Sequence, residues 1–261
     1  MIPLRDNLRC TTFPIATLIL IALNCAAFFV ELMVAGSGNL DSLFGTWTMV
    51  PAKVVAAFAS GNPAAIGMAV ATVFASMFLH GGWMHIIGNM LFLNCFGRGM
   101  EARLGRVRFV LFYLLSGVLA ATVHIWSDPT SMVPTLGASG AIAGVLGGYL
   151  LLWPKAEVKG IFLLVFIPIP IRLRAYWFLL AWFVVQVYEV INSLGQVVPG
   201  GGVAYWAHAG GFVAGLVLAG LWKLYRPVSD VCYIPTDCAC PPEAPEDGTK
   251  SDDDSEGGEG K

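Results

Sequence analysis

The stretch FLHGGWMHIIGNMLFLNCFG, residues 78–97, decides the fold class of this chain. After a pair of glycines it continues as an apolar run that meets no formally charged residue until Arg98. His85 and Asn89 lie four positions apart within this run, so a helix places both side chains on one face. Because polar groups inside an apolar helix are costly in lipid, they usually mark a functional site.

The composition extends this picture to the whole chain. Of its 261 residues, 57% are hydrophobic and 12% are charged, about half the charged fraction of a typical soluble domain. Crossing a bilayer takes about 20 apolar residues, and stretches near that length recur along the sequence. We therefore predict an all-α, polytopic membrane protein, built as a six-transmembrane-helix bundle. The predicted spans are residues 13–35, 82–101, 108–127, 138–153, 173–194 and 203–225.

Two further segments are apolar but fit a span less well. Residues 36–81 contain an apolar run at 64–79 that is rich in glycine and alanine, and we interpret the segment as a loop partly embedded in the membrane, with a seventh span as the alternative. Residues 161–171 are too short to cross and contain Pro168 and Pro170, so they are predicted to be a connector.

The basic residues predict the orientation of the bundle. With six spans, 14 of the 15 lysines and arginines fall on one side, and Lys53 alone falls on the other. Since cytoplasmic loops carry the excess of positive charge, this side is predicted to be cytoplasmic. It includes residues 1–12 and the end of the chain, and we place the protein in a prokaryotic cell (inner) membrane.

Residues 227–261 differ from the rest of the chain. They contain ten of the 17 acidic residues among prolines and glycines, which predicts a disordered acidic tail. Cys232, Cys238 and Cys240 lie there without a histidine or a fourth cysteine beside them. The chain also has no HExxH motif, so no metal is expected, and no cofactor is predicted.

Several polar residues share one predicted depth. Counting from the basic end of each helix at about 1.5 Å per residue places Ser139, His208 and His85 roughly 22–24 Å above that boundary, with Asn89 one turn lower. His124 falls in the same layer, so depth alone does not choose between the histidines. Its neighbours are bulky, whereas His208 lies among small residues that permit close contact between membrane helices.

These residues suit a nucleophilic reaction. Ser139 lies in GASG (137–140) at the predicted start of a helix, where free backbone N–H groups favour a developing negative charge. A serine hydroxyl needs a base within hydrogen-bonding reach, which His208 can supply. His85 and Asn89 can both donate hydrogen bonds to an oxyanion.

Three motifs together resemble the rhomboid family of intramembrane serine proteases. They are FLHGGWMHIIGNMLFL at 78–93, GASGAIAG at 137–144 and HAGG at 208–211, in the expected order. The likeness covers roughly residues 13–225. It implies a rhomboid-like six-helix bundle and a protease that cleaves single-pass transmembrane proteins near the outer face of the bilayer. It suggests no nucleic-acid partner and leaves the oligomeric state open.

The resemblance also implies the role of each site residue. Ser139 is the implied nucleophile and His208 the general base, forming a dyad without a third carboxylate. The oxyanion hole is implied to consist of His85, Asn89 and the backbone N–H of Ser139.

Two positions depart from the pattern of well-studied relatives. The first loop often carries a Trp-Arg pair, whereas this chain has Trp47 followed by Thr48. Some relatives place an aromatic residue four positions after the serine, where this chain has Ala143. Tyr205 or Trp206 is the candidate to compensate.

Two other functions compete with proteolysis. A rhomboid-like protein that binds client helices without cutting them usually lacks the serine or the histidine, and this chain has both. A small transporter would use a proton relay, but no inverted repeat is visible in the sequence. The candidate relay residues are His85, His124, His208 and Glu189. Glu31 and Glu189 are otherwise predicted to contact headgroups or cavity water.

Overall fold

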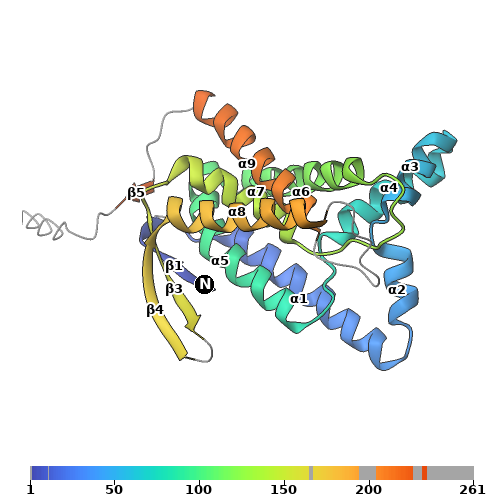
Figure 1. Cartoon of the computed structure of the whole chain (residues 1–261), viewed down its shortest axis with the longest axis horizontal. Coiled ribbons are helices and arrows are strands. Elements are labelled where there is room, and N and C mark those ends of the chain that lie inside the picture. Colours follow the sequence, from blue (N-terminus) through green and yellow to red (C-terminus); the bar gives the residue numbers. More distant parts are fainter. Residues whose placement is uncertain (1, 11, 165–166, 194–203, 226–230, 234–261) are drawn as a thin grey trace, which may run out of the picture.

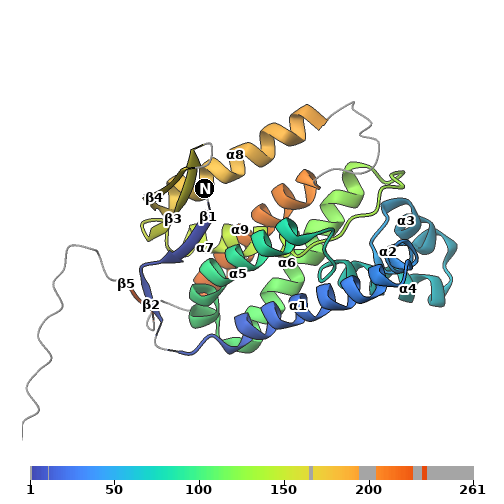
Figure 2. The same cartoon turned by 90° about the horizontal axis from the view of Figure 1, so that it is seen from below.

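The computed structural model describes residues 2–10, 12–164, 167–193, 204–225 and 231–233. The predicted tail, 227–261, lies outside this part of the chain except for Val231–Tyr233. The described residues form mostly helices, and the long ones pack side by side with small helices at one end of the bundle and β-strands at the other (Figures 1 and 2).

Six helices match the predicted spans, with ends within three residues of the predicted ones. They confirm the predicted helical bundle. They are α1 (Ile15–Gly36), α5 (Trp83–Leu104), α6 (Arg106–Ser127), α7 (Ser139–Leu152), α8 (Ala175–Ser193) and α9 (Tyr205–Tyr225).

Four of these helices are long and apolar enough to cross a membrane, namely α1, α6, α8 and α9. The six predicted crossings are compatible with this arrangement. α7 has 14 residues, which corresponds to a length of about 21 Å. It is therefore shorter than a full membrane span, and its first residue, Ser139, lies below the membrane surface on that side. α5 ends in a polar turn that contains Glu101 and Arg103.

The segment between the first two spans is helical rather than a loop. It forms α2 (Leu40–Trp47), α3 (Pro51–Ser60) and α4 (Pro63–Ser76). The sequence Ser-Gly-Asn-Pro at 60–63 explains the break between α3 and α4. Gly61 ends α3 in the left-handed conformation, with φ of 62°, and the side chain of Asn62 accepts a hydrogen bond from the N–H of Ala64 at 2.9 Å.

The predicted connector and the N-terminal residues form β-structure, which the prediction of an all-α bundle did not include. β1 (Ile2–Asp6), β3 (Glu157–Leu164) and β4 (Ile167–Arg174) make an antiparallel sheet in the order β1–β3–β4. β2 (Leu8–Cys10) pairs with β5 (Val231–Tyr233). Two prolines in β4 concealed the strand, because proline is tolerated in a sheet mainly at an edge, where β4 lies.

α7 lies at the centre of the bundle, and glycines allow its close contact with α9. A Cβ atom on Gly215 would collide with the backbone carbonyl of Gly144, and one on Gly211 with that of Gly140. The two backbones therefore touch, as the small residues of both helices predicted. This contact brings the first turn of α7 beside the first turn of α9.

The other end of the bundle is held by a buried carboxylate. Glu101 of α5 accepts hydrogen bonds from the backbone N–H groups of Ala16 and Thr17 at 2.9 and 2.7 Å, and from the Thr17 hydroxyl at 2.7 Å. These N–H groups belong to the first turn of α1, where no residue of the helix can accept them. Glu101 thus caps α1 and fixes it against α5.

Candidate active site

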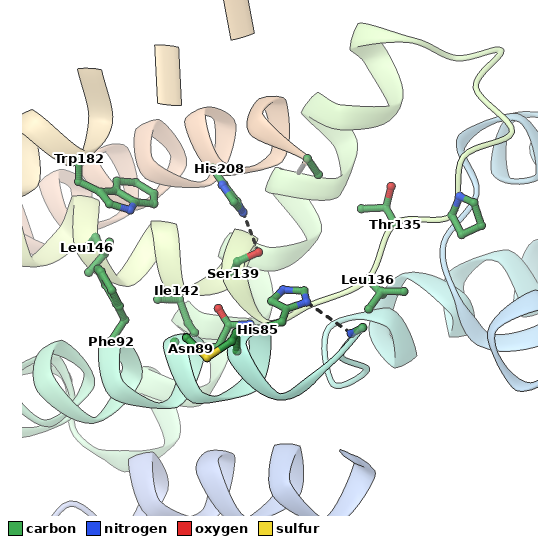
Figure 3. Close-up of a pocket in the computed structure, with 15 residues that line it drawn as sticks. His85, Asn89, Phe92, Thr135, Leu136, Ser139, Ile142, Leu146, Trp182 and His208 are labelled. Carbon is green, nitrogen blue, oxygen red and sulfur yellow. Dashed lines mark hydrogen bonds between the residues drawn. The ribbon is translucent and has the colours of Figure 1, made fainter. Parts of the chain in front are cut away.

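Ser139 and His208 meet where α7 and α9 begin. The distance between Ser139 Oγ and His208 Nε2 is 2.7 Å, which is a hydrogen bond (Figure 3). Ser139 is half-buried, and the His208 side chain is 9% exposed. A hydroxyl and an imidazole separated by 69 positions in the sequence are therefore in the arrangement that proton transfer requires.

Gln186 of α8 contacts the opposite side of the same imidazole. Its side-chain oxygen lies 2.7 Å from His208 Nδ1, and the Gln186 side chain is buried. Because an amide oxygen can only accept, Nδ1 carries the proton in this contact. In the neutral ring Nε2 is then the acceptor, and it faces the Ser139 hydroxyl.

Aromatic rings also surround His208, which bears on the departure at Ala143. The Trp182 ring lies 6.0 Å from the His208 ring between centroids, and Tyr205 lies 6.4 Å away, edge-on. Trp182 precedes Gln186 by one turn, so both side chains of α8 face the histidine. Of the two residues expected to compensate for Ala143, Tyr205 contacts the ring, and Trp182 is an additional contact that was not predicted.

His85 faces the first turn of α7 from α5. Its Nδ1 accepts a long hydrogen bond, 3.4 Å, from the backbone N–H of Gly81, so in the neutral ring Nε2 carries the proton (Figure 3). Nε2 lies against Gly137, where a Cβ atom would come within 2.7 Å of it. Gly137 also has φ of +124°, a conformation that favours glycine. The N–H of His85 is thus directed toward the loop that leads into Ser139.

Asn89 lies one turn further along α5 and is held from behind by His80. The Asn89 side-chain nitrogen lies 2.9 Å from His80 Nε2. His80 Nδ1 faces the carbonyl of Phe78 at 3.2 Å, so Nδ1 donates and Nε2 accepts from Asn89. Burial, and secondarily the nearby His85, lowers the pKa of His80 to about 4, which keeps its ring neutral at physiological pH.

Glu31 anchors this arrangement from α1. Its two carboxylate oxygens lie 3.0 and 3.3 Å from the backbone nitrogen of His80 and accept its N–H. The Glu31 side chain is 3% exposed. The prediction that Glu31 contacts headgroups or water was therefore wrong, because the loop after α4 folds over it. A chain of contacts runs from Glu31 through His80 to Asn89.

His124 contacts a residue other than the serine. Its Nε2 lies 2.9 Å from the hydroxyl of Thr135, which belongs to the loop before α7. The choice between His124 and His208, which depth left open, is decided by this geometry in favour of His208.

A cavity of about 650 Å³ connects these groups. Its polar lining comes mainly from His85, Asn89, Ser139 and His208, whereas the remaining wall is largely apolar (Figure 3). The apolar wall includes Met84, Phe92, Ile142, Leu146 and Trp182. The described residues contain no group of three or more histidine, cysteine or acidic side chains placed to hold a metal ion.

Sequence reasoning missed Gln186, His80 and Glu31 as members of this site. Gln186 did leave a signal, since it is an amide that follows an apolar run in α8, from Trp177 to Val185. Glu31 also left a signal, as an ionisable residue in a span, but its partner was not predictable, because the contact with His80 depends on the path of the loop after α4.

Comparison with known proteins agrees with the motifs. The rhomboid domain matches residues 68–224, more than half of the chain. The chain is 30% identical over 161 residues to Rhomboid protein 1, mitochondrial, of Saccharomyces cerevisiae, which covers 60% of this chain and 42% of that protein. It is 35% identical over 150 residues to RHOMBOID-like protein 4 of Arabidopsis thaliana, covering 57% and 33% respectively.

A bacterial relative is also similar. Rhomboid protease GluP of Bacillus subtilis is 34% identical over 139 residues, which cover 52% of this chain and 24% of that protein. The chain thus spans less than half the length of each of these relatives. The domain match nevertheless includes Ser139 and His208, as well as His85 and Asn89 of α5. The chain therefore belongs to the rhomboid family of integral membrane proteins.

Proposed function

We propose that this chain is an intramembrane serine endopeptidase that cleaves transmembrane helices near the outer membrane face. The observation that carries the proposal is the 2.7 Å hydrogen bond between Ser139 Oγ and His208 Nε2, which opens onto the cavity. The apolar wall of that cavity suits a substrate segment that arrives from lipid. Membership of a family whose named relatives include proteases is consistent with it.

The reaction begins with proton transfer between the two residues. As the Ser139 oxygen bonds to the scissile carbonyl carbon, its proton moves to His208 Nε2. His208 then gives this proton to the leaving nitrogen as the peptide C–N bond breaks, leaving an acyl-enzyme. A water molecule then attacks the acyl carbon and loses a proton to Nε2. The bond between that carbon and Ser139 Oγ breaks, and Nε2 returns the proton to the serine oxygen, which releases the new carboxyl end and restores the serine.

The negative charge that develops on the carbonyl oxygen needs preorganised donors. The donors in this proposal are three N–H groups of residues that line the cavity: the His85 Nε2–H, the second amide N–H of Asn89, and the backbone N–H of Ser139 at the start of α7. Since His80 occupies one amide N–H of Asn89, the other remains to face the cavity. Donors fixed in a water-poor site stabilise such a charge without reorganisation.

Gln186 acts in this mechanism as a positioning residue. By accepting the Nδ1–H of His208, it selects the tautomer in which Nε2 can take the serine proton. It also fixes the ring plane toward Ser139. An amide does this without placing a second charge inside the bundle, where an unpaired carboxylate would be costly.

The proposed substrates are single-pass transmembrane proteins, and the proposed location is a prokaryotic cell membrane. The distribution of lysine and arginine favours an orientation with residues 1–12 on the cytoplasmic side. On this orientation the cavity lies toward the outer face.

A serine-directed fluorophosphonate probe and a reconstituted helix substrate test the proposal together. We expect wild-type protein in vesicles to be labelled and to cut the substrate, and Ser139→Ala and His208→Ala to do neither. A protein that binds client helices without cutting would retain substrate binding yet show no cleavage. Cleavage that persists in Ser139→Ala would overturn the assignment.

A further inference from the structure

The hairpin of β3 and β4 has one apolar face, whereas its charged residues, Glu157, Lys159, Arg172 and Arg174, lie on the other face beside Ile161, Pro168 and Pro170. Alternate residues of a strand lie on one face. In the observed register, one face of this hairpin is apolar throughout, and its outer part is exposed: Phe162 is 44% exposed and Ile167 is 64% exposed. The described side chains of this face are Val158 and Phe162 of β3 with Ile167, Ile169, Ile171 and Leu173 of β4.

The apolar face looks toward the helices. Val158 belongs to it and is completely buried in the core of the bundle. Asp6 of β1 pairs with Val158, and its carboxylate accepts a hydrogen bond from the Tyr149 hydroxyl of α7 at 2.6 Å. The hairpin crosses the end of the bundle rather than continuing along it (Figure 1). Because lipid surrounds the helices, the outer part of this face, with Phe162 and Ile167, looks toward lipid.

The opposite face carries a row of cations, one from each strand of the sheet. Arg5 of β1 pairs with Lys159 of β3, which pairs with Arg172 of β4. Arg5 and Arg172 are exposed, and Lys159 is half-buried. Like charges directly opposite each other destabilise a sheet. A row of three therefore indicates an anionic partner on this face.

The edge of the sheet is unsuited to a protein strand. β4 is the outer strand, and it contains Pro168 and Pro170. Neither has a backbone N–H, and both occupy positions whose N–H would point away from β3. An added strand, from a second copy of the chain or from a peptide, would lose both hydrogen bonds.

We propose that the β3–β4 hairpin lies in the headgroup layer of an anionic bilayer. Its apolar face rests on the acyl boundary, and Arg5, Lys159 and Arg172 reach lipid phosphates from the other face, with their long side chains bending to that level. The occupant is the surrounding bilayer rather than the acidic residues after Tyr233. An acidic segment would neutralise the cations but leave Phe162 and Ile167 exposed to water.

This surface continues directly into the bundle. α8 begins at Ala175, immediately after β4, and the Ala175 N–H donates to the carbonyl of Ala156 at 2.7 Å. The hairpin therefore holds the start of the helix that carries Gln186. The lipid proposal itself does not depend on the proposed protease activity.

Photo-crosslinking identifies the occupant. The full chain, with p-benzoyl-phenylalanine in place of Ile167, is reconstituted into vesicles of phosphatidylglycerol and phosphatidylcholine and irradiated, and the products are identified by mass spectrometry. We expect lipid adducts, with a yield that falls at least about fivefold in pure phosphatidylcholine, since each basic residue near an anionic surface contributes a factor of about five.

A matched pair of variants tests the cation row. Lys159→Gln with Arg172→Gln, which leaves Arg5 in place, should lower the adduct yield most of the way to the phosphatidylcholine level. Arg106→Gln with Lys223→Gln, which removes the same charge from exposed residues at the same end of the bundle, should leave it unchanged. Thermal unfolding in detergent monitors folding of both variants. A crosslinked dimer, a crosslink to residues after Tyr233, or no adduct at all would each overturn the proposal.

Discussion

Gln186 Oε1 and His208 Nδ1 are 2.7 Å apart, so the imidazole of the serine–histidine pair is held on both nitrogens at once. α8 supplies one contact and α7 the other, while α9 carries the ring. The orientation of the histidine therefore depends on three helices, and a change in the position of α8 would be felt at the nucleophile.

Removing the amide of Gln186 should slow the chemical step. Gln186→Leu cannot accept the Nδ1–H, so the wrong tautomer becomes populated, and we expect kcat to fall at least about tenfold with KM little changed. Gln186→Glu retains an acceptor at this position and should recover part of that loss. Steady-state cleavage of a reconstituted helix substrate measures both. Equal losses in the two variants would mean that the contact only fills space.

The hydrogen bond from Asn89 to His80 should affect catalysis by fixing the orientation of the Asn89 side chain. Asn89→Ala removes one oxyanion donor and should reduce kcat on the order of a hundredfold. His80→Ala leaves the amide in place but frees its rotation, so its loss should be smaller. The double variant should be no worse than Asn89→Ala, because the two residues form one unit. Additive losses in the cycle would show that His80 acts elsewhere.

Gly137 should tolerate no side chain. In Gly137→Ala the new Cβ would press on the His85 ring, and we expect activity to fall at least about tenfold. Gly38→Ala is the matched control. Gly38 also has positive φ, +76°, so the substitution carries backbone strain, although less than at Gly137, and nothing lies within 4 Å of its Cβ position. Cleavage assays should separate the two, and a similar loss in both would implicate strain alone.

The contact of α7 with α9 should be sensitive to a single methyl group. Gly215→Ala places a Cβ against the carbonyl of Gly144, so the helices must separate, and overpacking of this kind costs about 1–3 kcal/mol. Gly67→Ala in α4 meets nothing within 4 Å and should be neutral or slightly stabilising. Thermal unfolding in detergent measures both. Equal stability of the two variants would contradict the close packing.

The sequence predicted the six long helices closely because they depend on local properties. Hydropathy defines each span, and spacing places His85 and Asn89 on one face of α5. The small residues around Ser139 and His208 indicated the contact between α7 and α9. Nothing beyond neighbouring residues was needed for these predictions.

Two segments, β4 and the region between α1 and α5, could not be predicted from local sequence properties. β4 was not predicted, because its two prolines and short apolar run are typical of a connector. Its pairing with β3 depends on residues of both strands. The segment between α1 and α5 was apolar enough to suggest a loop in the membrane. It forms three helices, and the loop after the last of them, α4, places the backbone N–H of His80 against Glu31.

The sequence by itself determined that this chain is a helical membrane protein, and it predicted a serine and three histidines at one depth with an asparagine one turn lower. The tertiary structure alone decided that the His208 ring lies within hydrogen-bonding distance of Ser139, and that Gln186, His80 and Glu31 support the site. The physical reason is that hydropathy and periodicity act within a helix, whereas hydrogen bonds 2.7 Å long between helices depend on the rotation and tilt of each one.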